Sequence, residues 1–316
     1  MRRNILNGSH VGPLLCSWQW FYRWTPEFRG KGRVLRGWPG RLVRSWPSDV
    51  TIASREGCIF SHCDLKDYLY QVLFFCGYYE PDVDWMTSRL LRPEDVFVDV
   101  GACYGYHALT NARRVGPKGK VIAFEPQPDV FASLRENALL NGLSNIEVEN
   151  LALSDRTECL QLHRFSDLGV GHTSFGELQA HAVSQTISCD ATTLDEFVAR
   201  KGIGRVRLVK LDVEGAELKV LMGAKGLLRA STPPMWILEA NEATARSCGY
   251  KPQDLLSLLA QYGYKTYRVV WSNVPRRILR IEPCPHVIGP SQNLLCLIPT
   301  VHASVLPGIN GEANQG

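Results

Sequence analysis

The sequence of 316 residues contains no run of about 18 apolar residues, the length that typically spans a membrane as a helix. We therefore expect no transmembrane segment. Residues 14–21 are too few and too aromatic for the apolar core of a signal peptide, and no small-residue cleavage site follows them. The expected location is therefore cytoplasmic.

The ten cysteines include no C-x-x-C pair. Cys58, His62 and Cys63 have the ligand types of a zinc site, but no fourth ligand lies at a suitable spacing. We interpret this group as a coincidence and expect no metal ion. Scattered cysteines within predicted strands and helices are typical of buried free thiols in a cytoplasmic chain.

Acidic residues are nearly absent from the first 48 residues, although the net charge of the whole chain is only +4. The basic residues there are Arg2, Arg3, Arg23, Arg29, Lys31, Arg33, Arg36, Arg41 and Arg44, interleaved with eight aromatic residues between Trp18 and Trp46. Such mixtures bind nucleic acids or lie on membrane surfaces. No nucleic-acid-binding motif accompanies this one, so we favour an irregular extension that packs some aromatic residues on the main domain. Peripheral membrane contact through this extension stays open.

From residue 64 to about residue 300, short apolar runs alternate with stretches of helical period. We predict strands over 96–100, 121–124, 146–151, 206–211, 236–240, 264–270 and 293–298. Helices are predicted over 64–91 with a break at Gly77, and over 104–115, 127–141, 194–201, 216–229 and 252–262. Residues 154–193 break this rhythm with two alternating stretches, 159–163 and 186–188, on either side of a loop.

Apolar strands flanked by helices imply a largely parallel sheet that is covered on both faces. The last two strands have no helix between them, so one of them should run antiparallel to its neighbour. We predict an α/β fold with a Rossmann-like, seven-stranded, mostly parallel sheet and one reversed strand at the edge. Residues 1–63 form the basic, aromatic extension, 64–300 the main domain, and 301–316 a flexible tail.

The most informative feature is an apolar strand, Val96–Val100, that runs directly into a turn at Gly101. A second apolar strand ends at Glu125, 24 residues after Gly101. Glycine lets the chain turn tightly and lets backbone N–H groups approach a ligand. Because ligands of open α/β sheets bind at the carboxyl ends of strands, Glu125 is placed to accept hydrogen bonds from both hydroxyls of a ribose. This arrangement predicts a nucleotide-containing cofactor.

The glycine spacing separates two cofactor classes. A dinucleotide-binding turn has the spacing G-x-G-x-x-G, but Cys103 occupies the position of the second glycine. A nicotinamide oxidoreductase is therefore a weaker alternative. The spacing from Asp99 through Gly101 to Gly105 is D-x-G-x-x-x-G, which resembles the first motif of S-adenosylmethionine (SAM) methyltransferases of the Rossmann-like type.

A longer series of motifs, over about residues 64–300, resembles the FkbM-type methyltransferases. The matching pieces are Gly77–Glu80, Val98–Ala102, Gly105–Tyr106, Ala123–Pro126, Glu136–Asn137, Asn141–Leu143, Ala152–Asp155, Thr193–Asp195, Lys210–Glu217 and Leu238–Glu239. The run K-L-D-V-E-G-A-E at 210–217 is the most specific. Cys103 departs from the family, which usually has asparagine there. We expect the change to be tolerated, because that loop contacts the cofactor mainly through its backbone.

The resemblance implies a sheet of the class I methyltransferase type and SAM as the cofactor. The residues that it assigns to cofactor binding are Asp99, Gly101, Ala102, Gly105, Glu125, Ser154 and Asp155. Ser154 and Asp155 follow the third strand, a position that suits contact with the adenine amino group.

Asp212 and Glu214 lie where the fourth main strand turns into its helix. If the strand continues, both carboxylates lie on one side and face the cleft. The alternative is a stabilising role at the start of the helix, which suits Glu217 better. If the acceptor is an alcohol, its proton must be removed, and Asp212 is the first candidate for this base. The second is His172, which is otherwise a solvent-facing loop residue.

These observations predict a SAM-dependent O-methyltransferase that acts on a hydroxyl of a sugar, a glycan or a secondary metabolite. Glu239, at the end of the fifth strand, either lines the acceptor pocket or is solvated there. The remaining alternative is a methyltransferase-like module that binds a partner without catalysis. We expect the acceptor to be a small molecule or a carbohydrate. Acceptor pockets are built from variable loops, here 164–185 and 271–291, and the sequence of such loops does not identify the ligand.

Overall fold

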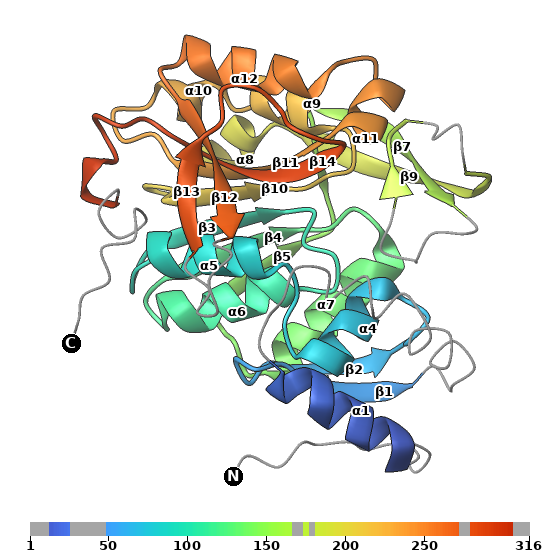
Figure 1. Cartoon of the computed structure of the whole chain (residues 1–316). Coiled ribbons are helices and arrows are strands. Elements are labelled where there is room, and N and C mark those ends of the chain that lie inside the picture. Colours follow the sequence, from blue (N-terminus) through green and yellow to red (C-terminus); the bar gives the residue numbers. More distant parts are fainter. Residues whose placement is uncertain (1–12, 26–48, 166–172, 177–180, 272–278, 306–316) are drawn as a thin grey trace.

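The computed structural model describes residues 13–25, 49–165, 173–176, 181–271 and 279–305 (Figure 1). Its largest sheet has eight strands in the order β13-β12-β14-β11-β10-β3-β4-β5. The bounds are β3 (Val96–Val100), β4 (Lys120–Phe124), β5 (Ile146–Glu149), β10 (Leu208–Leu211), β11 (Met235–Asn241), β12 (Lys265–Trp271), β13 (Leu279–Pro283) and β14 (Ser291–Leu297). All seven predicted strands are present.

The strand directions confirm a mostly parallel sheet. β5, β4, β3, β10 and β11 are parallel neighbours, whereas β14 is antiparallel to both β11 and β12. The reversed strand β14 therefore lies inside the sheet, and a second reversed strand, β13, forms its edge. β13 is an eighth strand, antiparallel to β12, in the segment 271–291 that was predicted to be a loop.

Helices cover both faces of this sheet, and the strand residues alternate between two hydrophobic cores. Phe97 of β3 packs in one core, with helices α4 (Tyr68–Cys76), α5 (Pro81–Leu90), α6 (Tyr106–Val115) and α7 (Pro128–Leu140). Val98 and Val100 pack in the other core, with α8 (Leu194–Arg200), α9 (Glu217–Met222), α10 (Lys225–Arg229) and α12 (Pro252–Gln261). The short helices α11 (Glu242–Ser247) and η1 (Ala303–Val305) complete the described helices after β11. Figure 1 shows the sheet between these two layers.

The single helix predicted over 216–229 is wrong in one respect, because the structure divides it into α9 and α10 at Gly223. A Cβ atom at Gly223 would overlap the carbonyl oxygen of Ser154, so the backbone approaches closely at this point. Asp195 then holds the start of α10, where its carboxylate accepts hydrogen bonds from the N–H groups of Gly226 (2.6 Å) and Leu227 (2.9 Å). Tertiary contacts therefore override the helical period of this stretch.

Four strands in the described residues between 152 and 192 form a second sheet beside the first. Its order is β6-β9-β7-β8, with β6 (Ala152–Leu153), β7 (Glu158–Phe165), β8 (Thr173–Ser174) and β9 (Val183–Thr192). The two alternating stretches predicted there are the paired strands β7 and β9. The Ser174 hydroxyl of β8 donates to the carbonyl oxygen of Glu214 (2.7 Å), which ties this sheet to the turn after β10.

Loop and short helix are predicted for residues 1 to about 50, and the structure has a short helix there together with a hairpin that was not predicted. Helix α1 (Pro13–Trp24) precedes an antiparallel hairpin of β1 (Val50–Ala53) and β2 (Ile59–Cys63). In the hairpin, the N–H groups of Ile59 and Ser61 donate to the side chains of Asn141 (2.8 Å) and Asn137 (3.0 Å) near the end of α7. None of the helices in the described ranges combines the length and the apolar character that crossing a bilayer requires.

Candidate active site

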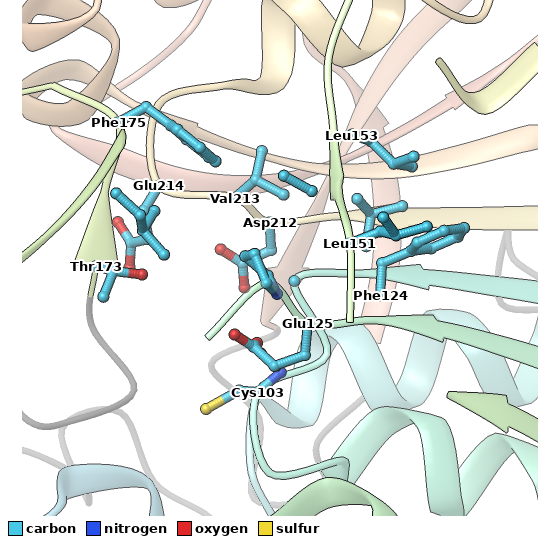
Figure 2. Close-up of a pocket in the computed structure, with 15 residues that line it drawn as sticks. Cys103, Phe124, Glu125, Leu151, Leu153, Thr173, Phe175, Asp212, Val213 and Glu214 are labelled. Carbon is cyan, nitrogen blue, oxygen red and sulfur yellow. The ribbon is translucent and has the colours of Figure 1, made fainter. Parts of the chain in front are cut away.

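A pocket opens at the carboxyl ends of β3, β4 and β10, where an open α/β sheet binds its ligands (Figure 2). Its floor is the turn after β3, including Gly101 and Cys103. Apolar side chains of Phe124, Leu151, Leu153, Leu162, Phe175 and Val213 form most of its walls. Three acids, Glu125, Asp212 and Glu214, supply its charged groups. An apolar slot with an acid at its edge suits a nucleoside.

Backbone N–H groups fix the Glu125 carboxylate in this pocket. One oxygen accepts from the N–H of Cys103 (3.0 Å) and the other from the N–H of Gln127 (2.9 Å). Each oxygen keeps a lone pair for a ligand. The side chain is only 5% exposed, and burial raises the pKa of Glu125 to about 7, against the two backbone hydrogen bonds that lower it. The predicted position of Glu125 at the end of the second strand is thus the position observed.

A second pocket adjoins the first and shares Gly101, Cys103, Asp212 and Glu214 with it. Its other lining residues are Asp67, Leu69, Tyr79, Ala102, Tyr106, His107 and Lys210. Aromatic rings and polar groups therefore alternate around this compartment, whereas the first is mainly apolar. The shared acids Asp212 and Glu214 mark the boundary between the two compartments.

Asp212 forms an ion pair with a buried lysine at this boundary. Lys210 Nζ lies 2.9 Å from Asp212 Oδ2, and strand alternation places the two side chains on the same face. Burial raises the pKa of Asp212, but the Lys210 ammonium outweighs burial, so the pKa lies below its usual value. Burial, Asp212 and Glu214 all raise the pKa of Glu239 well above its usual value. Lys210 therefore favours the ionised form of Asp212, whereas burial beside two other acids favours the protonated form of Glu239.

Asp212, Glu214 and Glu239 each offer a carboxylate oxygen within 4.8 Å of the others, a grouping that is also compatible with a cation. Lys210 already places a positive charge against Asp212. Ser291 Oγ donates to Glu239 at 2.6 Å. Glu239 therefore belongs to this acidic group and is not simply a solvated side chain at the strand end.

Glu217 holds the turn that presents Asp212 and Glu214. Its buried carboxylate accepts from the N–H groups of Val213 (3.1 Å) and Gly215 (3.1 Å), and from the hydroxyl of Tyr250 (2.7 Å). These bonds satisfy donors of the turn that precedes α9, and Glu217 is the first residue of that helix, where the sequence predicts a stabilising acid. Glu214 has a φ of +52°, so the turn is a strained shape that Glu217 stabilises.

Two further groups lie beside the main strands: His107, which lines the second compartment, and Asp99, a predicted cofactor ligand that is buried and lines neither compartment. His107 Nε2 is 2.9 Å from a carboxylate oxygen of Glu80, and burial lowers the pKa of His107 to about 4, so its ring is neutral. Asp99 is 1% exposed, and neither of its carboxylate oxygens has a hydrogen-bond partner among the described residues. A buried carboxylate of this kind is costly unless a ligand completes it.

Comparison with known proteins agrees with this geometry. The sequence model described as "Methyltransferase FkbM domain" matches residues 99–266, which is more than half of the chain. The chain belongs to the FkbM methyltransferase family. The match extends from the end of β3 to the start of β12, so it includes the turn at Gly101, Glu125 and the whole 210–217 run. The prediction of this family is confirmed.

Three relatives of this FkbM-family chain are named as methyltransferases. It is 28% identical over 158 residues to 2-O-methyltransferase NoeI of Sinorhizobium fredii, covering 45% of this chain and 63% of that protein. It is 30% identical over 161 residues to 31-O-demethyl-FK506 methyltransferase FkbM of Streptomyces tacrolimicus, covering 43% and 61%. Hexuronic acid methyltransferase AglP of Haloferax volcanii is 29% identical over 184 residues, covering 58% and 68%. The chain thus spans about three fifths to two thirds of the length of these relatives.

Among solved structures, a SAM-dependent O-methyltransferase from Thermotoga maritima has 12% sequence identity to this chain. Its TM-score is 0.37, and the alignment covers 81% of this chain and 95% of that one. Precorrin-6y C5,15-methyltransferase from Geobacter metallireducens has 12% identity and a TM-score of 0.39, covering 69% and 91%.

Not every predicted site residue of this FkbM-family chain reaches the two compartments. Ser154 is fully buried, and its hydroxyl donates to Glu158 (3.0 Å) and Asp155 (3.2 Å). Neither Ser154 nor Asp155 lines the first pocket, whose wall here is Leu151, Ala152 and Leu153. Their predicted contact with adenine is therefore not supported. Both residues directly follow β6, a strand of the second sheet, and the Ser154 hydroxyl is bonded to Glu158 of β7 in that sheet.

Three other predicted residues have different outcomes. Ala102 lines the second compartment, and its N–H donates to the Phe124 carbonyl (2.9 Å). Gly105 lines neither compartment; it precedes α6 with a φ of +92°, and a Cβ there would overlap Leu134 of α7. Its role in the structure is helix packing. His172 lies outside the described residues.

Some lining residues were not predicted. Lys210 stands in the most specific motif, and its two-residue spacing from Asp212 was the available signal for a shared face. Tyr79 is part of the Gly77–Glu80 piece, but its place beside Gly101 depends on how α4 and α5 pack. Asp67 comes from the start of α4, where it accepts the N–H of Leu69 (2.9 Å). Such long-range neighbours carry no local sequence signal.

Cys103 has a φ of +49°, a left-handed conformation that asparagine adopts more readily than cysteine. We expect Cys103→Asn to raise the melting temperature by about 1–3 °C. Affinity for S-adenosylhomocysteine should stay within about threefold, because the 103 N–H still donates to Glu125. Cys103→Val should instead lower both the melting temperature and the affinity, since a β-branched residue is strained at positive φ. Thermal melts and calorimetry test this; equal behaviour of the two variants contradicts it.

Proposed function

We propose that this chain is a SAM-dependent methyltransferase that methylates a hydroxyl group of a sugar, a glycan or a secondary metabolite. The observation that carries the proposal is the juxtaposition of a mainly apolar pocket, with Glu125 at its edge, and a polar compartment across Asp212. The names of NoeI, FkbM and AglP support it, since each names a methyltransferase and two name an O-methyl position.

The residues present fit SAM. Phe124, Leu153 and Phe175 offer apolar surface to adenine, and Glu125 keeps lone pairs for the ribose hydroxyls. The buried carboxylate of Asp99, which has no partner among the described residues, suits the amino group of the methionine part. When bound, SAM supplies a methyl group activated by a sulfonium. The protein has to hold the acceptor oxygen in line and receive its proton.

The second compartment is the proposed acceptor site. Tyr79 and Tyr106 offer aromatic faces, while Asp67 and Asp212 accept hydrogen bonds from hydroxyls. Asp212, kept ionised by Lys210, is a weak base toward a free alcohol. It is sufficient toward an oxygen that becomes positive as the new C–O bond forms, because that oxygen loses its proton readily. We therefore assign to Asp212 the orientation of the hydroxyl and the late acceptance of its proton.

Calorimetric titration of the purified chain with SAM and S-adenosylhomocysteine tests the cofactor. Mass spectrometry of polar extracts incubated with the protein and methyl-labelled SAM then tests transfer and reveals the acceptor. No binding of either compound at high micromolar concentration contradicts the proposal. Binding without transfer to any extract would favour the alternative of a non-catalytic binding module.

Glu125 makes cofactor affinity depend on pH. Its pKa of about 7 means that the ionised fraction falls as the pH drops through neutrality. If the ionised form binds the ribose, affinity for S-adenosylhomocysteine should weaken about fourfold from about pH 8.5 to about pH 6.5. Glu125→Gln should bind about ten- to a hundredfold more weakly and without this slope. Calorimetry at several pH values decides; a flat wild-type profile would remove Glu125 as the ribose ligand.

A further inference from the structure

The second sheet supplies one wall of the first pocket. Leu162 of β7, Thr173 of β8 and Phe175, which follows β8, line this wall. Figure 2 shows Thr173 and Phe175 across the pocket from Phe124 of β4. The ring of Phe175 also packs against the small hydrophobic core of the second sheet. What a ligand meets on this side of the pocket therefore depends on where β8 is held.

Strand β8 is short and pairs with β7 alone among the described strands. Its position is fixed by the buried side chain of Gln127, at the start of α7. The amide oxygen of Gln127 accepts from Nε (3.2 Å) and Nη2 (2.8 Å) of Arg164, and its amide nitrogen donates to Oγ1 of Thr173 (3.3 Å). Arg164 and Thr173 lie opposite each other in the pairing of β7 with β8. One buried amide therefore holds both strands.

Both residues of β8 are tied to turns that carry acids of the pocket. Thr173 is held by Gln127, whose backbone N–H also donates to Glu125, the carboxylate assigned to the ribose. The buried hydroxyl of Ser174 donates to the carbonyl oxygen of Glu214 (2.7 Å). β8 therefore connects the turn after β4 with the turn after β10.

We propose that β8 is a clamp on the nucleoside of SAM, in which Thr173 and Phe175 contact the cofactor and Gln127 is the positioning residue that holds them there. Because it takes SAM as the ligand of the first pocket, this role rests on the proposed function. Phe175 offers an aromatic face and Thr173 a hydroxyl to the nucleoside. Contacts that are held in place before binding cost less to order, so the clamp should slow release of the cofactor.

A purely structural role for Gln127 is the alternative. Residues that begin a helix often cap it with their side chains, but Gln127 makes no side-chain capping bond to α7. Its amide bonds instead to two residues of the second sheet, one of which lines the pocket. A structural role predicts lower stability with normal binding, whereas a clamp predicts faster release of the ligand.

Surface plasmon resonance of S-adenosylhomocysteine on the immobilised full chain, well below the melting temperature, tests the clamp. Gln127→Ala should raise the dissociation rate about tenfold and change the association rate by less than about twofold. Phe175→Ala should lower the affinity about tenfold, and Thr173→Val about threefold. Because Gln127 and Thr173 act through one bond, the double variant Gln127→Ala/Thr173→Val should bind about as weakly as Gln127→Ala alone.

Gln161→Ala is the matched control. Gln161 Nε2 donates to Ser188 Oγ (2.9 Å) across β7 and β9, and strand alternation places Gln161 on the face opposite to Leu162. This variant loses a similar bond in the same sheet and should release the ligand at the wild-type rate. If Gln127→Ala melts at a lower temperature but releases the ligand like the wild type, or if Phe175→Ala binds normally, the proposal is overturned. If the wild-type chain does not bind, the proposed function fails together with the clamp.

Discussion

Gly101→Ala is expected to lower the melting temperature by about 5–15 °C and to abolish detectable binding of S-adenosylhomocysteine. Gly101 has a φ of +80°, and a Cβ there would overlap the backbone carbonyl of Asp212. The left-handed conformation costs about 1 kcal/mol and the overlap about 1–3 kcal/mol, since backbone cannot move as a flexible side chain does. The overlap would also push the turn at Gly101 away from the turn at Asp212, and both of these turns line both compartments. Thermal melts and calorimetry measure the two effects.

Gly142→Ala separates backbone strain from the overlap. Gly142 also has a positive φ, of +62°, but an added Cβ meets no atom within 4 Å. Gly142→Ala should therefore lower the free energy of unfolding by only about 1 kcal/mol, and the variant should bind S-adenosylhomocysteine normally. If Gly101→Ala melts like the wild type and still binds, Gly101 does not form the cofactor turn. If Gly101→Ala is as stable as the wild type but does not bind, the added methyl group clashes with the ligand and not with Asp212.

The sheet could be predicted because buried parallel strands are nearly continuous apolar runs with helical stretches between them. The strands at 96–100 and 121–124 are recognisable for this reason. β13 was not predicted, because it is held by pairing with β12 and has no strong pattern of its own. The break at Gly223 was missed for a similar reason: it results from contact with Ser154, 69 residues earlier in the chain.

The same distinction applies to the site. Glu125 and Asp212 stand at strand ends, and strand ends meet at one edge of a parallel sheet, so their convergence followed from position alone. Ser154 stands at a comparable position, yet the second sheet turns it away from the pocket. That sheet could not be foreseen from residues near Ser154. The ion pair of Lys210 with Asp212 needed only strand alternation, but its effect on the pKa of Asp212 depends on burial by elements distant in sequence.

Asp212→Asn is expected to lower turnover about 10²–10⁴-fold while affinity for S-adenosylhomocysteine changes by no more than a few-fold. Asparagine keeps the size of the side chain and an oxygen that still accepts from Lys210 at the 2.9 Å position. What it loses is the negative charge and the ability to take a proton. Because Lys210 holds the pKa of Asp212 low, the wild-type rate should show no titration of Asp212 between about pH 6 and about pH 9.

Two variants make the Asp212 result specific. Glu239→Gln should keep turnover within about threefold, because the raised pKa of Glu239 favours its protonated form and glutamine has similar hydrogen-bonding groups. His172→Gln tests the other candidate base. If Asp212→Asn stays active while His172→Gln loses turnover together with a titration near neutral pH, then His172 is the base and Asp212 is structural. If both variants stay active, the acceptor needs no base, which points to an acidic hydroxyl or a carboxylate as the methylated group.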